Sequence, residues 1–85
     1  MSKQSKALEK LSQEPTPSNY KWDDLRSLLI SLGYVEIKGS GSRRKFFHET
    51  KNALISCHQP HPNPDVDKGC ISDIVKHLKD HQFIK

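Results

Sequence analysis

The stretch 34-YVEIKGSGSRRKFFHETKNALISCH-58 contains three short segments in which apolar and polar residues alternate. A two-residue period is typical of β-strands, and the segments are Tyr34–Lys38, Arg43–His48 and Ala53–His58. The connections 39–42 and 49–52 are short, so consecutive strands are expected to pair as an antiparallel meander. The alternation is expected to place Val35 and Ile37, and either Phe46 or Phe47, on the buried face.

Amphipathic segments flank this predicted sheet on both sides. Residues 22–32 and 69–82 both repeat apolar side chains at helical spacing. Gly33 can end the first helix, and Asp67 can cap the second. The element order α-β-β-β-α predicts a two-layer α+β fold, with a three-stranded antiparallel sheet and both helices on one face. The predicted core is Trp22, Leu25, Leu28, Leu29, Val35, Ile37, Ile55, Ile71, Ile74, Val75 and Leu78.

Composition separates a tail from a folded domain. Residues 1–18 are rich in Ser, Gln, Lys, Glu and Pro and are predicted to be a disordered polar tail, and residues 19–85 form the domain. There is no apolar run of about 18 residues and no apolar leader after the N-terminal lysines, so no membrane segment is expected and the cytoplasm is the expected location. Cys57 and Cys70 are expected to be free thiols, Cys57 buried and Cys70 half exposed.

The net charge of +4 and the pI of about 9.2 favour a polyanionic partner, most often nucleic acid. Basic residues concentrate around a Gly-Ser segment whose backbone can approach a phosphate closely. The spacing is not that of a P-loop. The alternative is a flexible hairpin with solvated charges. The predicted phosphate-binding residues are Lys38, Ser42, Arg43, Arg44 and Lys45, with Lys51 on the rim.

Imidazoles near the third strand are candidates for proton transfer. His58 ends the third strand, His61 lies in the following loop with three prolines, and His48 ends the second strand. Such groups can take a proton from a ribose 2′-hydroxyl, which then attacks the adjacent phosphorus. His61 is the first choice, ahead of His58 and His48, and the alternative is that these are ordinary turn residues. No third or fourth ligand accompanies the histidines, so no metal or other cofactor is expected.

The motifs occur in an order that resembles the HicA family of bacterial toxins. They are the Trp22 helix ending in Leu32-Gly33-Tyr34, the strand Gly41-Ser42-Arg43-Arg44-Lys45-Phe46, His61-Pro62, the helix start Lys68-Gly69, and Ile74. The resemblance covers about Tyr20 to Phe83. It implies a fold similar to a double-stranded RNA-binding domain (dsRBD), cleavage of mRNA, and a HicB-like antitoxin that covers the active surface.

The chain departs from this family at one important position. HicA toxins commonly carry their catalytic histidine directly after Gly-Ser, where this chain has Arg43. Arginine keeps its proton at neutral pH and cannot act as the base. Cleavage would then need His48, His58 or His61. The predicted function is a HicA-like toxin that binds and cleaves mRNA by metal-free 2′-hydroxyl attack. The alternatives are a non-catalytic, dsRBD-like RNA-binding module, and a protein- or DNA-binding domain of the same shape.

Overall fold

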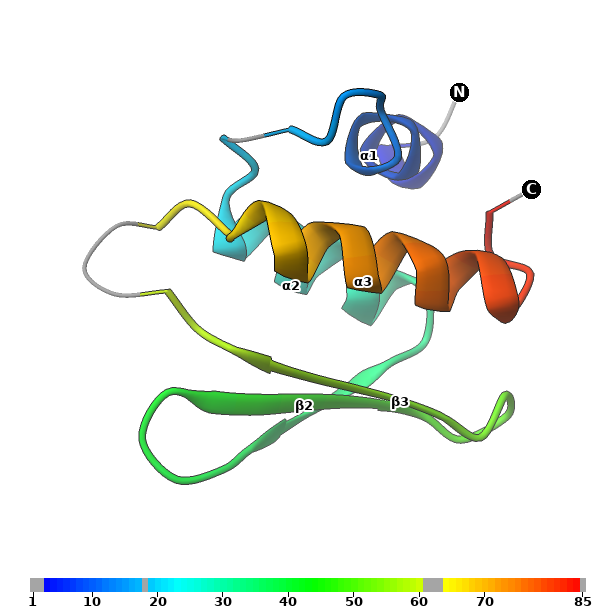
Figure 1. The fold of residues 1–85 in the computed structure, drawn as a ribbon. Helices are drawn as coiled ribbons and strands as arrows, with labels where there is room; N and C mark the ends of the chain where they lie inside the picture. Colours follow the sequence, from blue (N-terminus) through cyan, green and yellow to red (C-terminus); the bar gives the residue numbers. More distant parts are fainter. Residues whose placement is uncertain (1–2, 18, 61–63, 85) are drawn as a thin grey trace.

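The computed structural model describes residues 3–17, 19–60 and 64–84 and arranges them in three layers (Figure 1). The strands β1 (Val35–Lys38), β2 (Arg43–His48) and β3 (Ala53–His58) form one antiparallel sheet in the order β1-β2-β3. The helices α2 (Trp22–Ser31) and α3 (Lys68–Asp80) cover one face of this sheet, and its other face is uncovered. The predicted α+β fold, similar to a dsRBD, is confirmed. No helix in the described ranges is long and apolar enough to cross a membrane.

The third layer is helix α1 (Lys3–Leu11), which differs from the disordered tail expected over residues 1–18. It lies on the side of α2 and α3 that faces away from the sheet (Figure 1). Leu11 is only 1% exposed, and Tyr20, also buried, places its hydroxyl 3.4 Å from the carbonyl oxygen of Ala7. Burial of Leu11 and Tyr20 supplies the apolar contact that an isolated nine-residue helix needs for stability.

Strand β1 presents the face opposite to the one predicted. Val35 and Ile37 are 64% and 46% exposed and lie on the uncovered face, so their assignment to the core was wrong. The register pairs Val35 with Phe47, whereas Glu36 pairs with the fully buried Phe46. Glu36 can face the helices because its Oε1 accepts a hydrogen bond from Nε of Arg26 in α2 at 2.9 Å. Glu36 is thus a polar residue on the inner side of an edge strand, and its carboxylate has a hydrogen-bond partner in α2.

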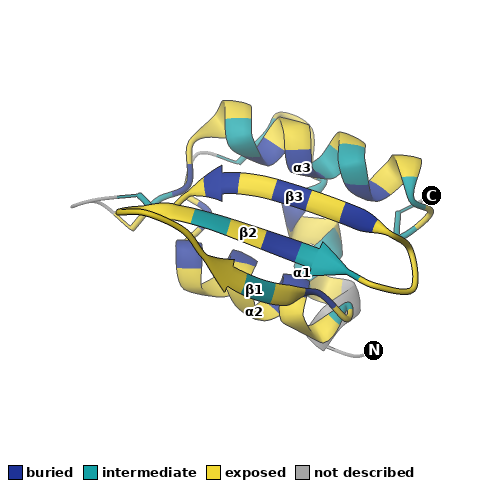
Figure 2. Cartoon of the chain, turned by 90° about the horizontal axis from the view of Figure 1, so that it is seen from below, coloured by how far each residue is buried: buried dark blue, intermediate teal, exposed yellow. Residues whose placement is uncertain are grey.

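The core lies between the sheet and α2 and α3, and it extends to α1. Strand β3 has a buried residue at every second position, whereas Phe46 is the one buried residue of β2 (Figure 2). Trp22 contributes to this core, with its ring centroid 5.9 Å from that of Phe46. Val75, predicted in the core, is only partly buried against it. The buried residues are Leu11, Tyr20, Trp22, Leu25, Leu28, Leu29, Tyr34, Phe46, Ala53, Ile55, Cys57, Val66, Ile71, Ile74 and Leu78.

Helix α3 begins one residue earlier than expected. Its N-cap is Asp67, as predicted, and the Asp67 carboxylate accepts hydrogen bonds from the backbone amides of Gly69 and Cys70 at 3.0 and 3.3 Å. The segment before α3 is also held to the start of α2, because the amide of Val66 donates to the carbonyl of Tyr20 at 2.8 Å. These bonds hold the N-terminus of α3 close to the start of α2.

We expect Gly33→Ala to lower the free energy of unfolding by about 1–3 kcal/mol. Gly33 follows α2 with φ of +105°, and an added Cβ would lie 2.7 Å from Nε2 of His48. Gly41→Ala is the control, because Gly41 also has a positive φ (+58°) but no heavy atom lies within 4 Å of its added Cβ. Urea unfolding followed by circular dichroism measures both. If both variants lose the same free energy of unfolding, the contact between the added Cβ and His48 does not destabilise the fold.

Candidate nucleic-acid interface

The connection between β1 and β2 is a tight loop held by its own backbone. The amide of Gly39 donates to the carbonyl of Arg43 at 3.0 Å, and the amide of Arg43 donates to the carbonyl of Ser40 at 3.1 Å. Gly41, with φ of +58°, supplies the left-handed conformation that the turn requires. Nη1 of Arg44 donates to the carbonyls of Gly41 and Arg43 at 3.0 and 2.7 Å. Arg44 therefore stabilises the loop that lies between Lys38 and Arg43.

His58 lies beside this loop. The register pairs His58 with Arg43 across β2 and β3. The Nδ1 atom of His58 is 3.4 Å from Oγ of Ser42, and the amide of Gln59 donates to the carbonyl of Ser42 at 2.8 Å. The fold thus brings the imidazole of His58 next to the hydroxyl of Ser42, 16 positions away in sequence, and to the guanidinium of Arg43. All three residues are exposed.

The uncovered face of the sheet changes from basic to apolar along its strands. At the end near the β1–β2 loop, His58 pairs with Arg43. In the middle of the sheet, Lys45 lies between its cross-strand partners Ser56 and Ile37. Towards the other end, Phe47 lies between Leu54 and Val35, which are 51% and 64% exposed. This face offers cations at one end and apolar side chains at the other.

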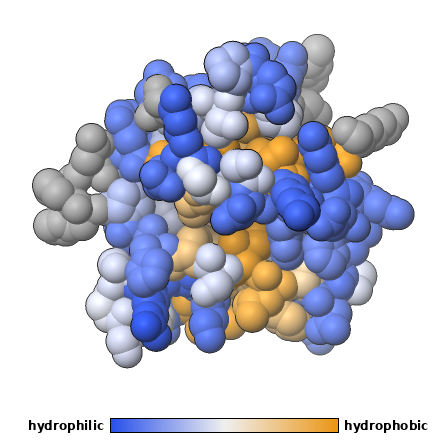
Figure 3. Space-filling model, viewed as in Figure 1, coloured by the Kyte–Doolittle hydropathy of each residue, from blue (hydrophilic) through white to orange (hydrophobic). Residues whose placement is uncertain are grey.

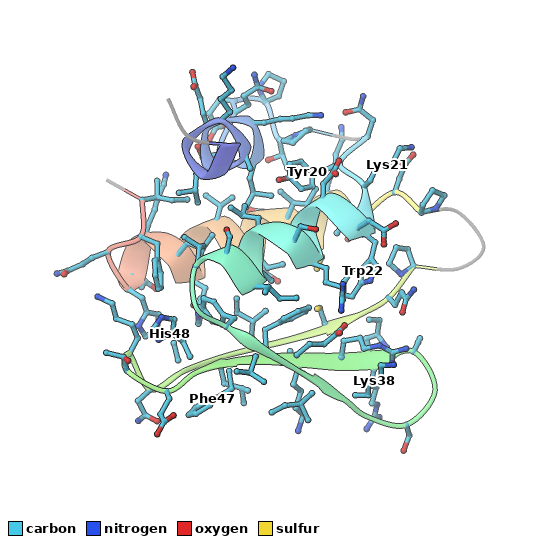
Figure 4. All side chains as sticks on the ribbon, turned by 180° about the vertical axis from the view of Figure 1, so that it is seen from behind. Tyr20, Lys21, Trp22, Lys38, Phe47 and His48 are labelled. Carbon is cyan, nitrogen blue, oxygen red and sulfur yellow. The ribbon has the colours of Figure 1, made fainter. Side chains whose placement is uncertain are left out.

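His48 is at the far end of β2 and is committed to the backbone. Its Nδ1 accepts the amide of Lys51 at 3.1 Å, so its Nε2 carries the proton and donates to the carbonyl of Leu32 at 3.0 Å. Five residue steps along β2 separate His48 from Arg43, or about 17 Å. Figure 4 shows His48 and Phe47 on opposite sides of the sheet, and Lys38 at the other end. The fold therefore does not bring His48 to the cluster formed by Ser42, Arg43 and His58.

An aromatic and imidazole cluster surrounds His48. The rings of Tyr34 and Phe83 pack on it, with centroids 5.2 and 5.4 Å away. Burial raises the pKa of Tyr34 to about 12, and its hydroxyl lies 2.8 Å from Nε2 of His77. Burial, together with the nearby charge of His81, lowers the pKa of His77. These shifts keep both partners neutral near pH 7, as suits a packed cluster that ties α3 to the sheet.

The remaining predicted site residues are more scattered. Lys38 ends β1 opposite Arg44 and is exposed beside the loop. Lys51 is exposed near His48, with its Nζ 5.5 Å from the centre of the Phe83 ring, so it lies away from the β1–β2 loop. His61 lies outside the described residues. Within those residues, no group of three or more His, Cys, Asp or Glu side chains could hold a metal ion.

The sequence did not indicate two features of this site. The contact between Ser42 and His58 depends on the β2–β3 register, which is a long-range property. The different roles of Arg43 and Arg44 depend on which side of β2 each residue occupies. A signal for the second feature was present, because adjacent residues of a strand point to opposite faces. That signal could be used only once the buried member of the Phe46–Phe47 pair was known.

The sheet and its two covering helices define an α+β domain similar to a dsRBD, with exposed cations at the start of β2. The family model for the HicA toxin of bacterial toxin–antitoxin systems matches residues 22–81. The chain therefore belongs to the HicA toxin family, and this membership implies an antitoxin partner. The matched residues contain α2, the sheet and α3, and they leave out α1. No curated protein and no solved structure matches the chain.

Proposed function

We propose that this HicA-family toxin binds mRNA at the basic end of its uncovered sheet face and cleaves it by attack of a ribose 2′-hydroxyl. The observation that carries this proposal is the cluster of His58, Ser42 and Arg43 beside a glycine loop. Arginine can bind a phosphate with two parallel hydrogen bonds. Lys45, on the same face, adds a second exposed cation. A phosphodiester bound there would lie within reach of an imidazole.

In this mechanism His58 takes the proton from the 2′-hydroxyl, and the 2′-oxygen then attacks phosphorus. A cation beside the phosphate stabilises the charge that develops in the transition state, and Arg43 and Lys45 are the candidates. The 5′-oxygen leaves and needs a proton from an acid. His61, the first choice for proton transfer from the sequence, is our candidate for that acid. The step requires no metal ion, so we expect cleavage to continue in excess chelator. The cytoplasm, where mRNA is translated, is the compartment that we propose.

We further propose that the antitoxin covers this same sheet face. Val35, Ile37 and Leu54 are large apolar residues that are 46–64% exposed, and they adjoin the cations of the proposed RNA site. Exposed apolar residues grouped on one face are typical of protein-interaction surfaces. An antitoxin that buried these side chains would also cover Lys45, so the antitoxin and RNA would exclude each other.

Arg43 favours a second candidate function, that of an RNA-binding module without catalysis. In this case the cations would hold RNA and His58 would only orient Ser42. The two functions share the binding surface and differ in turnover. A cleavage assay of the wild-type chain with labelled mRNA in excess chelator separates them. Intact RNA, together with measurable binding, would leave the non-catalytic module as the function.

The binding surface itself gives a test in solution. Arg43→Ala and Lys45→Ala should each weaken RNA binding for every sequence and reduce the slope of log K against log salt by about 0.7–0.9. Lys51→Ala is the matched control, because it removes the same charge at the far end of β2. Fluorescence anisotropy over a series of salt concentrations measures the slopes. If Lys51→Ala weakens binding as much as the other two, only net charge matters and the interface is misplaced.

A further inference from the structure

A cavity of about 860 Å³ lies between α3 and β3. Strand β3 is at the edge of the sheet, and no other strand in the described part of the chain closes this side. Hydrophobic residues are visible at the surface between α3 and the sheet (Figure 3). The cavity lining includes Cys57 from β3 and Cys70 from α3, both of which are free cysteines. Neither cysteine belongs to the proposed RNA site.

Cys57 from β3 and Cys70 from α3 line the same cavity, on the two elements that bound it. Cys57 is 7% exposed and points from β3 towards the helices, whereas Cys70, in the first turn of α3, is partly exposed. The hydrogen bond from Cys57 lowers the pKa of Cys70, and the same bond, with burial, raises the pKa of Cys57. The helix dipole also favours a thiolate in the first turn of a helix. The pair therefore combines an accessible sulfur at a helix N-terminus with a shielded one in the core.

We propose that Cys57 and Cys70 are a modification site for hydroperoxides, at which oxidation forms a reversible disulfide between β3 and α3. The Cys70 thiolate attacks the outer oxygen of a hydroperoxide and breaks the O–O bond. This gives a sulfenic acid on Cys70 and an alkoxide, which takes a proton to become the alcohol. The sulfur of Cys57 then attacks the sulfur of Cys70, forming the S–S bond and breaking the S–O bond.

The leaving hydroxide takes the proton of the Cys57 thiol and departs as water. The two thiols lose two electrons in all, and the peroxide gains them as alcohol and water. When the peroxide is hydrogen peroxide, the alcohol is a second water. The disulfide ties the end of β3, next to His58, to the N-terminus of α3. A dithiol such as dithiothreitol reverses the reaction by thiol–disulfide exchange.

Intact-mass spectrometry of the full-length folded chain tests the proposal. After hydrogen peroxide and then iodoacetamide, we expect a monomer that has lost two hydrogen atoms and carries no alkyl group. Dithiothreitol should restore two alkylatable thiols. Disulfide formation should be roughly ten-fold slower in urea, where the pairing and the lowered pKa of Cys70 are lost. Two thiols that stay alkylatable, an intermolecular disulfide, or an equal rate in urea would overturn the proposal.

Single-cysteine variants assign the roles of the two sulfurs. Cys57→Ala should leave Cys70 able to form a sulfenic acid, which a dimedone probe traps. Cys70→Ser should leave Cys57 unreactive towards both peroxide and the probe while the chain is folded. If the buried Cys57→Ala variant does not fold, Cys70→Ser carries the test alone, because Cys70 is partly exposed. Dimedone labelling of Cys57 in folded Cys70→Ser would contradict the assignment.

Discussion

His58→Ala should lower the rate of RNA cleavage by about 10²–10⁴-fold and leave RNA affinity almost unchanged. A positioned general base contributes to the transition state, whereas phosphate binding in the proposed site rests on Arg43 and Lys45. Single-turnover cleavage of labelled RNA in excess chelator measures the rate, and anisotropy measures the affinity. A parallel loss of affinity would mean that His58 binds RNA instead of moving a proton.

Two other histidines provide the comparison for this variant. His61→Ala should slow the reaction if His61 protonates the leaving oxygen. His48→Ala should change the rate only through stability, because both of its ring nitrogens bond to backbone groups. Thermal denaturation of each variant separates these effects. Wild-type rates in His58→Ala, with slower cleavage in His61→Ala only, would move the base to His61.

The sequence predicted the strands and the two covering helices because their patterns are local. Apolar residues at helical spacing and the two-residue period of the strands depend on near neighbours only. The bounds of β2 and β3 agree with the prediction, and α3 differs by one or two residues at its ends. The Asp67 cap is also local. Its carboxylate accepts hydrogen bonds from backbone amides that lie only two and three residues further along the chain.

The same reasoning chose the wrong face of β1 because alternation alone does not say which face is buried. Val35 and Ile37 are more apolar than Glu36, so the pattern favoured them for the core. The pairing of β1 with β2 overrode this preference, since it sets Glu36 beside Phe46. Arg26, ten residues away, makes the inner position acceptable for a carboxylate. None of these contacts is visible in a four-residue strand by itself.

Helix α1 was missed for a related reason. The segment Lys3–Leu11 has three apolar residues, Ala7, Leu8 and Leu11. These are too few to predict a stable isolated helix. The structure buries Leu11 in the shared core, with Ala7 and Leu8 packed against it. The candidate site was predictable in part. Its basic residues Arg43, Arg44 and Lys45 are consecutive in sequence, but the choice of His58 over His48 required the register.

Phe46→Ala should lower the free energy of unfolding by about 3–5 kcal/mol, and Phe47→Ala by about 1 kcal/mol or less. The two side chains have the same chemistry and adjacent positions in β2. Phe46 is fully buried and contacts Trp22, whereas Phe47 lies on the uncovered face between Leu54 and Val35. In a domain this small, the loss at Phe46 is a large part of the total stability.

Urea unfolding of both variants, followed by circular dichroism and by the fluorescence of Trp22, measures the difference. The comparison also tests the proposed interface, because the period of a strand links the two phenylalanines to the cations. If Phe46 faces the core, then Arg43 and Lys45 face outward with Phe47. A larger loss for Phe47→Ala would mean a register shifted by one residue. In that case Arg43 and Lys45 would turn towards the helices, and the site built on them could not bind RNA.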